Sequence, residues 1–166
     1  MSPSSPAAAQ PRWLNDSEMR AWRAFINGSQ RLIEVLNREL TEAHGLSIAD
    51  YRILVLLSES DTGSLRMSEL AEGIVSSRSR LTHQVRRLEE QGLVRRQDCP
   101  SDRRGVLAVL TDAGRTRLAT VAPTHVAGVR RHLVDHLSPA EQRTVAEVFG
   151  RVGSELPRAS SAARGH

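Results

Sequence analysis

One short stretch of the sequence combines arginine with serine, threonine and histidine, and side chains of these types can form hydrogen bonds with a nucleic acid. The apolar residues Leu81, Val85 and Leu88 recur at positions i, i+4 and i+7, which predicts a helix with one apolar face. In the major groove of duplex DNA, arginine can bond guanine with two hydrogen bonds, and serine, threonine or histidine can reach neighbouring base edges. The residues on the polar side of this helix that are predicted to enter the groove are Ser79, Arg80, Thr82, His83 and Arg86.

The positive charge of the chain is concentrated around this helix. Residues 76–117 hold ten arginines against five acidic residues, whereas the rest of the chain holds thirteen arginines against fourteen acidic residues. Such an excess predicts a local basic surface, on which Arg78 and Arg95 are candidate phosphate contacts. All 23 basic residues are arginine, which suits a phosphate-binding surface, although genomic base composition would produce the same bias. Taken alone, the charged helix could also be an ordinary solvated face.

The segment before this helix favours the DNA-binding interpretation. The sequence SELAEGI predicts a short helix that packs through Leu70 and Ile74 and turns near Gly73, which is the spacing of a helix-turn-helix. Ser76 and Ser77 stand where the N-cap of the second helix is expected, and Gly92 stands where that helix should end.

The segment after the helix predicts a β-hairpin, called a wing when it flanks a DNA-binding helix. Residues 92–96 and 106–110 have the pattern of two short strands, joined by a polar loop. Arg103 and Arg104 lie at the tip of this loop, and arginine suits the narrow, negative minor groove. We expect Asp102 to orient the Arg104 guanidinium through a charge-assisted hydrogen bond rather than to contact DNA.

These segments resemble the MarR group of winged helix-turn-helix transcription regulators. The resemblance rests on SELAEGIVSSRSRLTHQVRRLEEQGLVRR and PSDRRGVLAVLTDAG, and compatible helices extend it over roughly residues 13–156. It implies a mainly α fold with a small β-hairpin wing, in which a winged helix-turn-helix is joined to a helical dimerisation region. It also implies a homodimer that binds a palindromic operator and usually represses. Such regulators often release DNA when a small ligand or an oxidant arrives.

The chain is expected to form one domain with several regions. Residues 1–11 and 157–166 are predicted to be disordered tails, and residues 47–112 to be the winged helix-turn-helix. Residues 12–46 and 113–156 are predicted to be dimerisation helices, because they are apolar along their length and need a partner surface. A two-fold dimer would place its recognition helices roughly 34 Å apart, one turn of DNA. A monomer that closes these helices into one bundle is the alternative.

Several residues mark the ends and bends of these helices. Ser47 and Thr111 are predicted N-caps, and Ser138 followed by Pro139 is a strong helix start. Pro123 is predicted to kink the helix in which it lies.

Other residues raise functions besides DNA binding. By the resemblance, a small-molecule effector would bind between the dimerisation helices and the winged region, where core packing is the alternative role of the aromatic residues. Cys99 sits in the basic wing and is a candidate redox switch, although oxidation-sensing relatives usually carry their cysteine in the N-terminal helices. His132 and His136 have zinc-like spacing, but structural histidines are favoured and no metal is expected. The candidate effector residues are Trp22, Phe25, His44 and Tyr51.

The remaining features narrow the function class. The sequence lacks GxSxG, P-loop, GxGxxG and CxxC motifs, so neither an enzyme nor a bound cofactor is expected. A single cysteine and the lack of a long apolar run or secretory signal favour a cytoplasmic protein that does not cross a membrane. The leading hypothesis is therefore a dimeric, sequence-specific DNA-binding regulator. The alternative is a winged-helix architectural or protein-interaction module that binds DNA weakly and without sequence preference.

Overall fold

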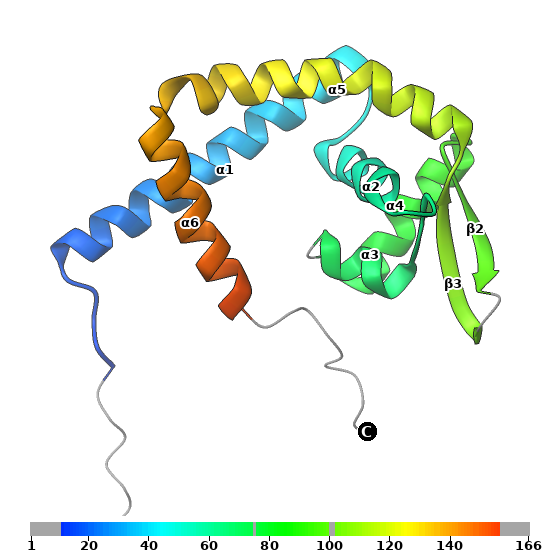
Figure 1. The fold of residues 1–166 in the computed structure, drawn as a ribbon, viewed down its shortest axis with the longest axis horizontal. Coiled ribbons are helices and arrows are strands. Elements are labelled where there is room, and N and C mark those ends of the chain that lie inside the picture. The colour runs from blue at the N-terminus through cyan, green and yellow to red at the C-terminus, as the bar shows by residue number, and fades with distance from the viewer. Residues whose placement is uncertain (1–10, 75, 100–101, 157–166) are drawn as a thin grey trace, which may run out of the picture.

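The computed structural model describes residues 11–74, 76–99 and 102–156, and the side chains of residues 102–104 are outside that description. Long helices form one part of the molecule, and shorter helices pack with a small antiparallel sheet in the other (Figure 1). This arrangement confirms the expected fold class. The outer helices are α1 (Asp16–His44), α5 (Asp112–His132) and α6 (Pro139–Glu155), with the short 3-10 helix η1 (Val134–His136) between the last two. The winged-helix part comprises α2 (Ile48–Glu59), α3 (Met67–Gly73), α4 (Arg78–Glu90), β1 (Ser64–Arg66), β2 (Val94–Cys99) and β3 (Asp102–Leu110).

Helix α1 is much longer than any helix of the winged-helix part. It starts at a capping box, in which Asn15 Oδ1 accepts from the backbone N–H groups of Ser17 and Glu18 at 2.9 Å each. The Glu18 carboxylate accepts in turn from the Asn15 N–H at 2.8 Å. The helix ends at Gly45, whose φ of 63° suits glycine. With 29 residues at 1.5 Å of rise each, α1 is about 43 Å long.

Helix α4 forms as its sequence predicts. The Ser77 hydroxyl accepts from the Arg80 N–H at 3.4 Å and caps the helix. Leu81, Val85 and Leu88 are all buried, so the predicted apolar stripe is the packed face.

The wing is larger than predicted and is part of a three-stranded sheet of order β1-β3-β2. Strand β2 pairs antiparallel with β3 over a register that runs from Val94 opposite Leu110 to Cys99 opposite Asp102, with an irregularity after Asp98. The third strand, β1, pairs with the other edge of β3 and was not predicted, because three residues are too few to show an alternating pattern.

The start of helix α5 packs closely against the backbone that precedes strand β2. Thr111 caps the helix by accepting from the Gly114 N–H at 3.0 Å. A Cβ at Gly114 would lie 2.1 Å from the Leu93 carbonyl oxygen, so only glycine allows this approach. The helix then continues past Pro123 to His132 as a single element. The predicted start at Ser138 is confirmed, with a full capping box to Glu141.

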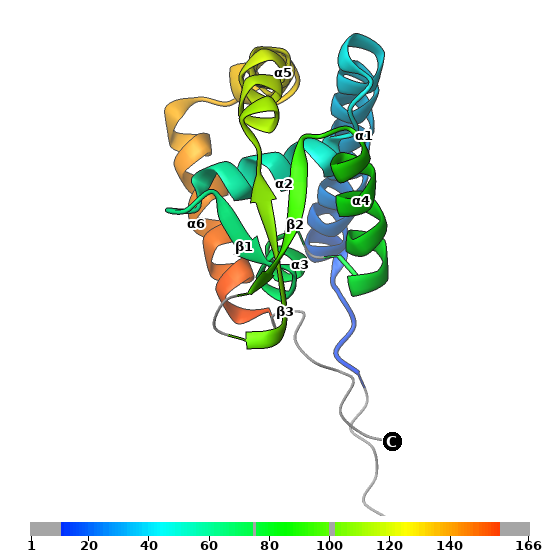
Figure 2. The same cartoon turned by 90° about the vertical axis from the view of Figure 1, so that its right-hand side faces the viewer.

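The buried core belongs almost entirely to the winged-helix part. Side chains of α2, α3, α4 and the sheet enclose it, and α1 and α5 contribute to it only locally, chiefly through Leu40 and Val121. Helix α6 has no buried residue. Figure 2 shows α4 and the β2–β3 hairpin side by side on one face of the molecule.

Candidate nucleic-acid interface

Helix α4 presents its polar side chains to solvent on the side away from its buried stripe. Its exposed positions include every residue predicted to enter the major groove: Ser79, Arg80, Thr82, His83 and Arg86. Arg86 Nε donates to Glu90 Oε1 at 3.0 Å, but both side chains are mostly exposed and such pairs contribute little to stability. The guanidinium is therefore not locked and could exchange this partner for a base.

A basic groove runs between α4, the start of α3 and the sheet. It encloses about 440 Å³ and is lined by Arg66, Ser68, Arg78, Thr82 and Arg96, together with apolar residues. Arg66, Ser68 and Arg96 were not predicted as contacts. Arg66 lies on the unpredicted strand β1, so no sequence pattern placed it here. Arg96 could have been found, because neighbouring strand residues point to opposite faces and Arg95 and Arg96 cannot both face away from α4.

Glu89 fixes the end of α4 to strand β2. Its carboxylate accepts from the backbone N–H of Arg96 at 2.9 Å and from the Arg96 guanidinium Nε at 2.8 Å. These contacts, the backbone hydrogen bond first, lower the pKa of Glu89 below its ordinary value. The wing therefore carries a fixed orientation relative to the recognition helix.

The wing is described only in part. Arg95 is exposed and donates to Gln97 Oε1 at 2.7 Å. The side chains of Asp102, Arg103 and Arg104 lie outside the described residues, so their minor-groove and orienting roles stay predictions. Cys99 is only 7% exposed, an environment that restricts access of an oxidant to its thiol.

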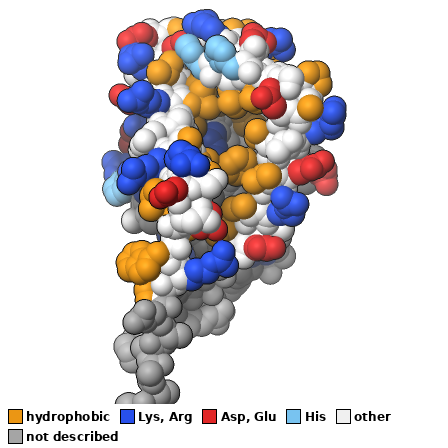
Figure 3. All heavy atoms as spheres, turned by 90° about the vertical axis from the view of Figure 1, so that its left-hand side faces the viewer, with side chains coloured by type: hydrophobic (Ala, Val, Ile, Leu, Met, Phe, Trp, Pro, Cys, Tyr) orange, Lys and Arg blue, Asp and Glu red, His pale blue; other side chains and the backbone are white. Residues whose placement is uncertain are grey.

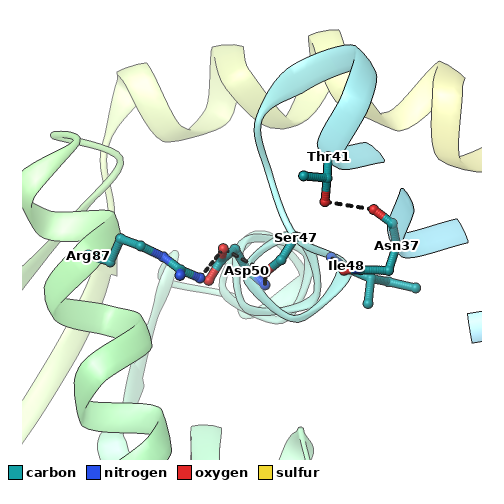
Figure 4. Close-up of polar contacts among 6 residues, drawn as sticks. All are labelled: Asn37, Thr41, Ser47, Ile48, Asp50 and Arg87. Atoms are coloured by element: carbon teal, nitrogen blue, oxygen red, sulfur yellow. Dashed lines mark hydrogen bonds and ion pairs between the residues drawn. The ribbon is translucent and has the colours of Figure 1, made fainter. Parts of the chain in front are cut away.

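An ion pair between a buried carboxylate and a half-exposed arginine joins α4 to the start of α2. Arg87 Nη2 contacts Asp50 Oδ2, and the Asp50 carboxylate also accepts from the Ser47 hydroxyl at 2.6 Å (Figure 4). Asp50 is only 3% exposed, the one charged residue among the buried ones that the structure describes. Asp50 was predicted only as the acidic residue in the first turn of helix α2, and its pairing with Arg87 was missed because the partners lie 37 positions apart in the sequence.

A second cavity, of about 440 Å³, lies between α1, α2 and α5. Tyr51 and His125 line it, with their rings 4.6 Å apart between centroids. Burial lowers the pKa of His125 and raises that of Tyr51, so both groups are neutral near pH 7. His125 Nδ1 is buried and lacks a hydrogen-bond partner among the described residues. The other residues that line the cavity are mainly aliphatic: Ile33, Leu36, Ile48, Val55, Leu56 and Val129, with Arg52.

The structure does not bring the candidate effector residues together. Tyr51 lines the cavity, whereas His44 is hydrogen-bonded to Thr124 Oγ1 at 2.7 Å. Trp22 and Phe25 lie in the N-terminal half of α1, where the Phe25 ring is 5.1 Å from that of Phe149 on α6. His125 was not predicted as a lining residue, because its meeting with Tyr51 depends on how α5 crosses α2.

His132 also has a structural partner. Its Nε2 lies 2.8 Å from Glu39 Oε1 on α1, and Arg131 reaches the same oxygen at 3.1 Å. These contacts, the His132 hydrogen bond first, lower the pKa of Glu39. His136 lies in η1. Among the described residues, no group of three or more His, Cys, Asp or Glu side chains could hold a metal ion.

The outer helices leave an apolar face uncovered. Figure 3 shows hydrophobic side chains gathered around a hollow on the side of the molecule away from the wing. Exposed apolar residues on α1 and α6 include Trp22, Phe25, Val145, Val148, Phe149 and Val152. A face of this kind on a single chain usually marks a contact surface. Within the described residues, no helix is both long and apolar enough to span a membrane.

Comparisons with known proteins agree with this geometry. A family model described as the MarR family matches residues 46–106. Among solved structures, the chain is similar to Sco3205 from Streptomyces coelicolor, a MarR family regulator solved in complex with DNA, with 41% identity and a TM-score of 0.86 over 93% of this chain and 97% of that one. It is also similar to AbsC, a MarR family regulator from the same organism, with 43% identity and a TM-score of 0.81 over 87% and 97%.

A curated relative of this chain is also named as a transcriptional regulator. YfiV from Bacillus subtilis, an uncharacterized HTH-type transcriptional regulator, is 31% identical over 146 residues, which cover 81% of this chain and 89% of that protein.

Proposed function

Because this chain belongs to the MarR family of transcriptional regulators, we propose that it is a homodimeric repressor that binds a palindromic DNA site. The observation that carries the proposal is the polar face of α4. A buried apolar stripe fixes the helix in the fold, and the opposite face offers hydrogen-bond donors and acceptors beside an arginine-lined groove.

Different residues have different roles in this proposal. Ser79, Arg80, Thr82, His83 and Arg86 on α4 contact base edges in the major groove. Arg78 and Arg95, together with Arg66 and Arg96 of the basic groove, contact phosphates. Arg103 and Arg104 at the wing enter the minor groove, with Asp102 orienting the Arg104 guanidinium. All of these belong to the winged-helix part.

The homodimer is supported by the uncovered face of α1 and α6. The Phe25 and Phe149 rings contact each other within the chain in a tilted arrangement yet remain 42% and 44% exposed, so a second copy of the same face could cover both. An isologous contact of this kind gives two-fold symmetry, which matches a palindromic site. The proposed regions are residues 12–46 and 113–156 for dimerisation and residues 47–112 for DNA binding.

Release by a small ligand is a further part of the proposal. The cavity lined by Tyr51 and His125 lies between the outer helices and the winged-helix part, and it combines aliphatic walls with a few polar groups. A small, mostly apolar molecule with one or two hydrogen-bonding groups fits this lining. Such a ligand changes DNA affinity only if it binds one arrangement of the two parts more tightly than the other.

Selection of bound sequences from random duplex DNA tests the proposal. The purified protein should enrich a palindromic sequence and bind it at least about 10³-fold more tightly than random duplex at the same salt concentration. A ratio below about 10 would instead favour the weakly binding architectural module. The selected duplex then serves to screen small apolar acids and phenols for loss of binding.

A further inference from the structure

The ion pair between Arg87 and Asp50 links the DNA-contacting face of α4 to the start of α2. At about 100° per residue, Arg87 projects between His83 and Arg80 around the axis of α4. Its side chain is 53% exposed, and it borders the same surface hollow as Ser79, Arg80 and His83. The contact therefore restrains α4, the helix whose polar face must point toward DNA.

Asp50 is itself held in place from two directions. Ser47 Oγ donates to the carboxylate and accepts from the Asp50 N–H at 3.2 Å, which fixes the first turn of α2 (Figure 4). The N–H of Ile48 donates to Asn37 Oδ1 on α1 at 3.0 Å, so the start of α2 is fastened to the long outer helix. The partner of Arg87 is thus a rigid point shared by α1 and α2.

Stability alone is a weak reason for this arrangement. Burying the Asp50 carboxylate carries a desolvation penalty, and the attraction of the half-exposed Arg87 offsets only part of it, so the pair adds little net stability. The positive end of the α2 dipole offsets part of this penalty. What the pair supplies is a restraint between two helices, because the charge-assisted hydrogen bond from Arg87 Nη2 to Asp50 Oδ2 forms only over a limited range of rotations of α4.

We propose that Asp50 and Arg87 are positioning residues for DNA recognition, which set the rotation of α4 relative to α1 and α2. When the pair is intact, the base-contacting side chains of α4 face the groove together. When it is broken, α4 is still held by its apolar stripe, but its rotation is less restricted. The proposal rests on the DNA-binding function proposed above.

The sign of one mutant effect separates positioning from simple electrostatics. Asp50→Ala removes a negative charge close to the DNA-binding surface, so charge alone would strengthen binding to every duplex. Positioning predicts the opposite for the selected duplex. Its affinity should fall about tenfold, while random duplex is bound as well as before or slightly better. The ratio of specific to random affinity is a readout that a purely structural role would not change.

Two more variants complete the experiment. Arg87→Ala should also lower the ratio of specific to random affinity, and the double variant should lower it no more than the worse single variant, because the two residues act together. Asp135→Ala removes an exposed ion pair of 2.7 Å to Arg130, far from the DNA-contacting face, and should leave the ratio unchanged. Thermal unfolding of each variant shows that the fold is retained. If Asp50→Ala does not fold, Asp50→Asn keeps the shape and should give a smaller loss of the same sign.

The outcomes are distinguishable. Failure of the wild-type protein to select any sequence would reject the proposed function itself. Selection by the wild type, combined with unchanged or increased specific affinity of folded Asp50→Ala, would overturn the positioning role alone.

Discussion

The two parts of the molecule differ in how completely they bury their own apolar side chains. The winged-helix part closes a core in which residues such as Leu54, Leu70 and Leu81 are fully or almost fully buried. The outer helices contact each other but leave rings such as those of Trp22 and Phe149 half exposed, and α6 buries nothing. The first part closes its own core, whereas the second part leaves an apolar face that the second copy in the proposed dimer would cover.

The largest effect is expected from a charge on the uncovered face. Phe149→Asp should convert the dimer to a monomer, because a carboxylate cannot be buried in an apolar contact without a partner. Losing the second half-site contact should weaken operator binding by about 10²-fold or more. Analytical ultracentrifugation and binding to the selected duplex measure the two effects. As a control for the ultracentrifugation alone, Val106→Asp changes an exposed apolar residue on β3 that lines the basic groove, and it should keep the dimer. A Phe149→Asp variant that remains dimeric would show that the uncovered face is not the dimer interface.

A core substitution tests the other part. Leu54→Ala should lower the free energy of unfolding by about 2–5 kcal/mol, since the side chain is fully buried and leaves a cavity. This loss should be the same at every protein concentration. Phe149→Ala, by contrast, should lower Tm mainly at concentrations at which the wild type is dimeric. Equal concentration dependence for the two variants would mean that the outer helices are not an interface.

A base contact should affect recognition without affecting assembly. Arg86→Ala is expected to lose about 1–3 kcal/mol of binding free energy and to relax the preference at one operator position. Arg95→Ala, a phosphate contact, should weaken all sequences alike and reduce the salt slope by about 1. Both variants should remain dimers. Equal losses for Arg86→Ala on selected and random duplex would contradict base contact by that residue.

The smallest effect concerns the junction of the two parts. Burial lowers the pKa of His125 below its ordinary value of 6.5, so the unfolded chain binds a proton more readily than the folded one. The stability due to neutral His125 is present above pH 6.5 and is lost as pH falls through its lowered folded pKa. His125→Phe should therefore flatten the decline of Tm between pH 7 and 5. An unchanged decline would show that other groups cause it.

The comparison also explains what the sequence could predict. The period of Leu81, Val85 and Leu88 predicted α4 correctly, since local spacing determines which face is buried. The same holds for the caps at Ser77 and Ser138. Contacts between distant segments left no local pattern, which is why Asp50 with Arg87 and Tyr51 with His125 were missed.

The four candidate effector residues do not line one cavity, because three of them lie along one long helix. Trp22 and His44 are 22 residues apart on one straight helix, which separates them by about 33 Å. Aromatic residues on a shared helix face therefore need not share a site. The strand β1 shows the same limit, because only its pairing with β3 identifies it as a strand.

The contact at Gly114 has a mechanical consequence. The start of α5 lies against the Leu93 carbonyl with no room for a side chain. We therefore expect α5 and the sheet to move together as one rigid body. Helix α5 has 21 residues and is about 31 Å long, so a tilt of about 5° at its far end displaces the wing by about 2.7 Å. That displacement is close to the 3.4 Å rise of one base pair. The angle at which two copies join would then determine, almost to the base pair, the spacing of half-sites that the dimer tolerates.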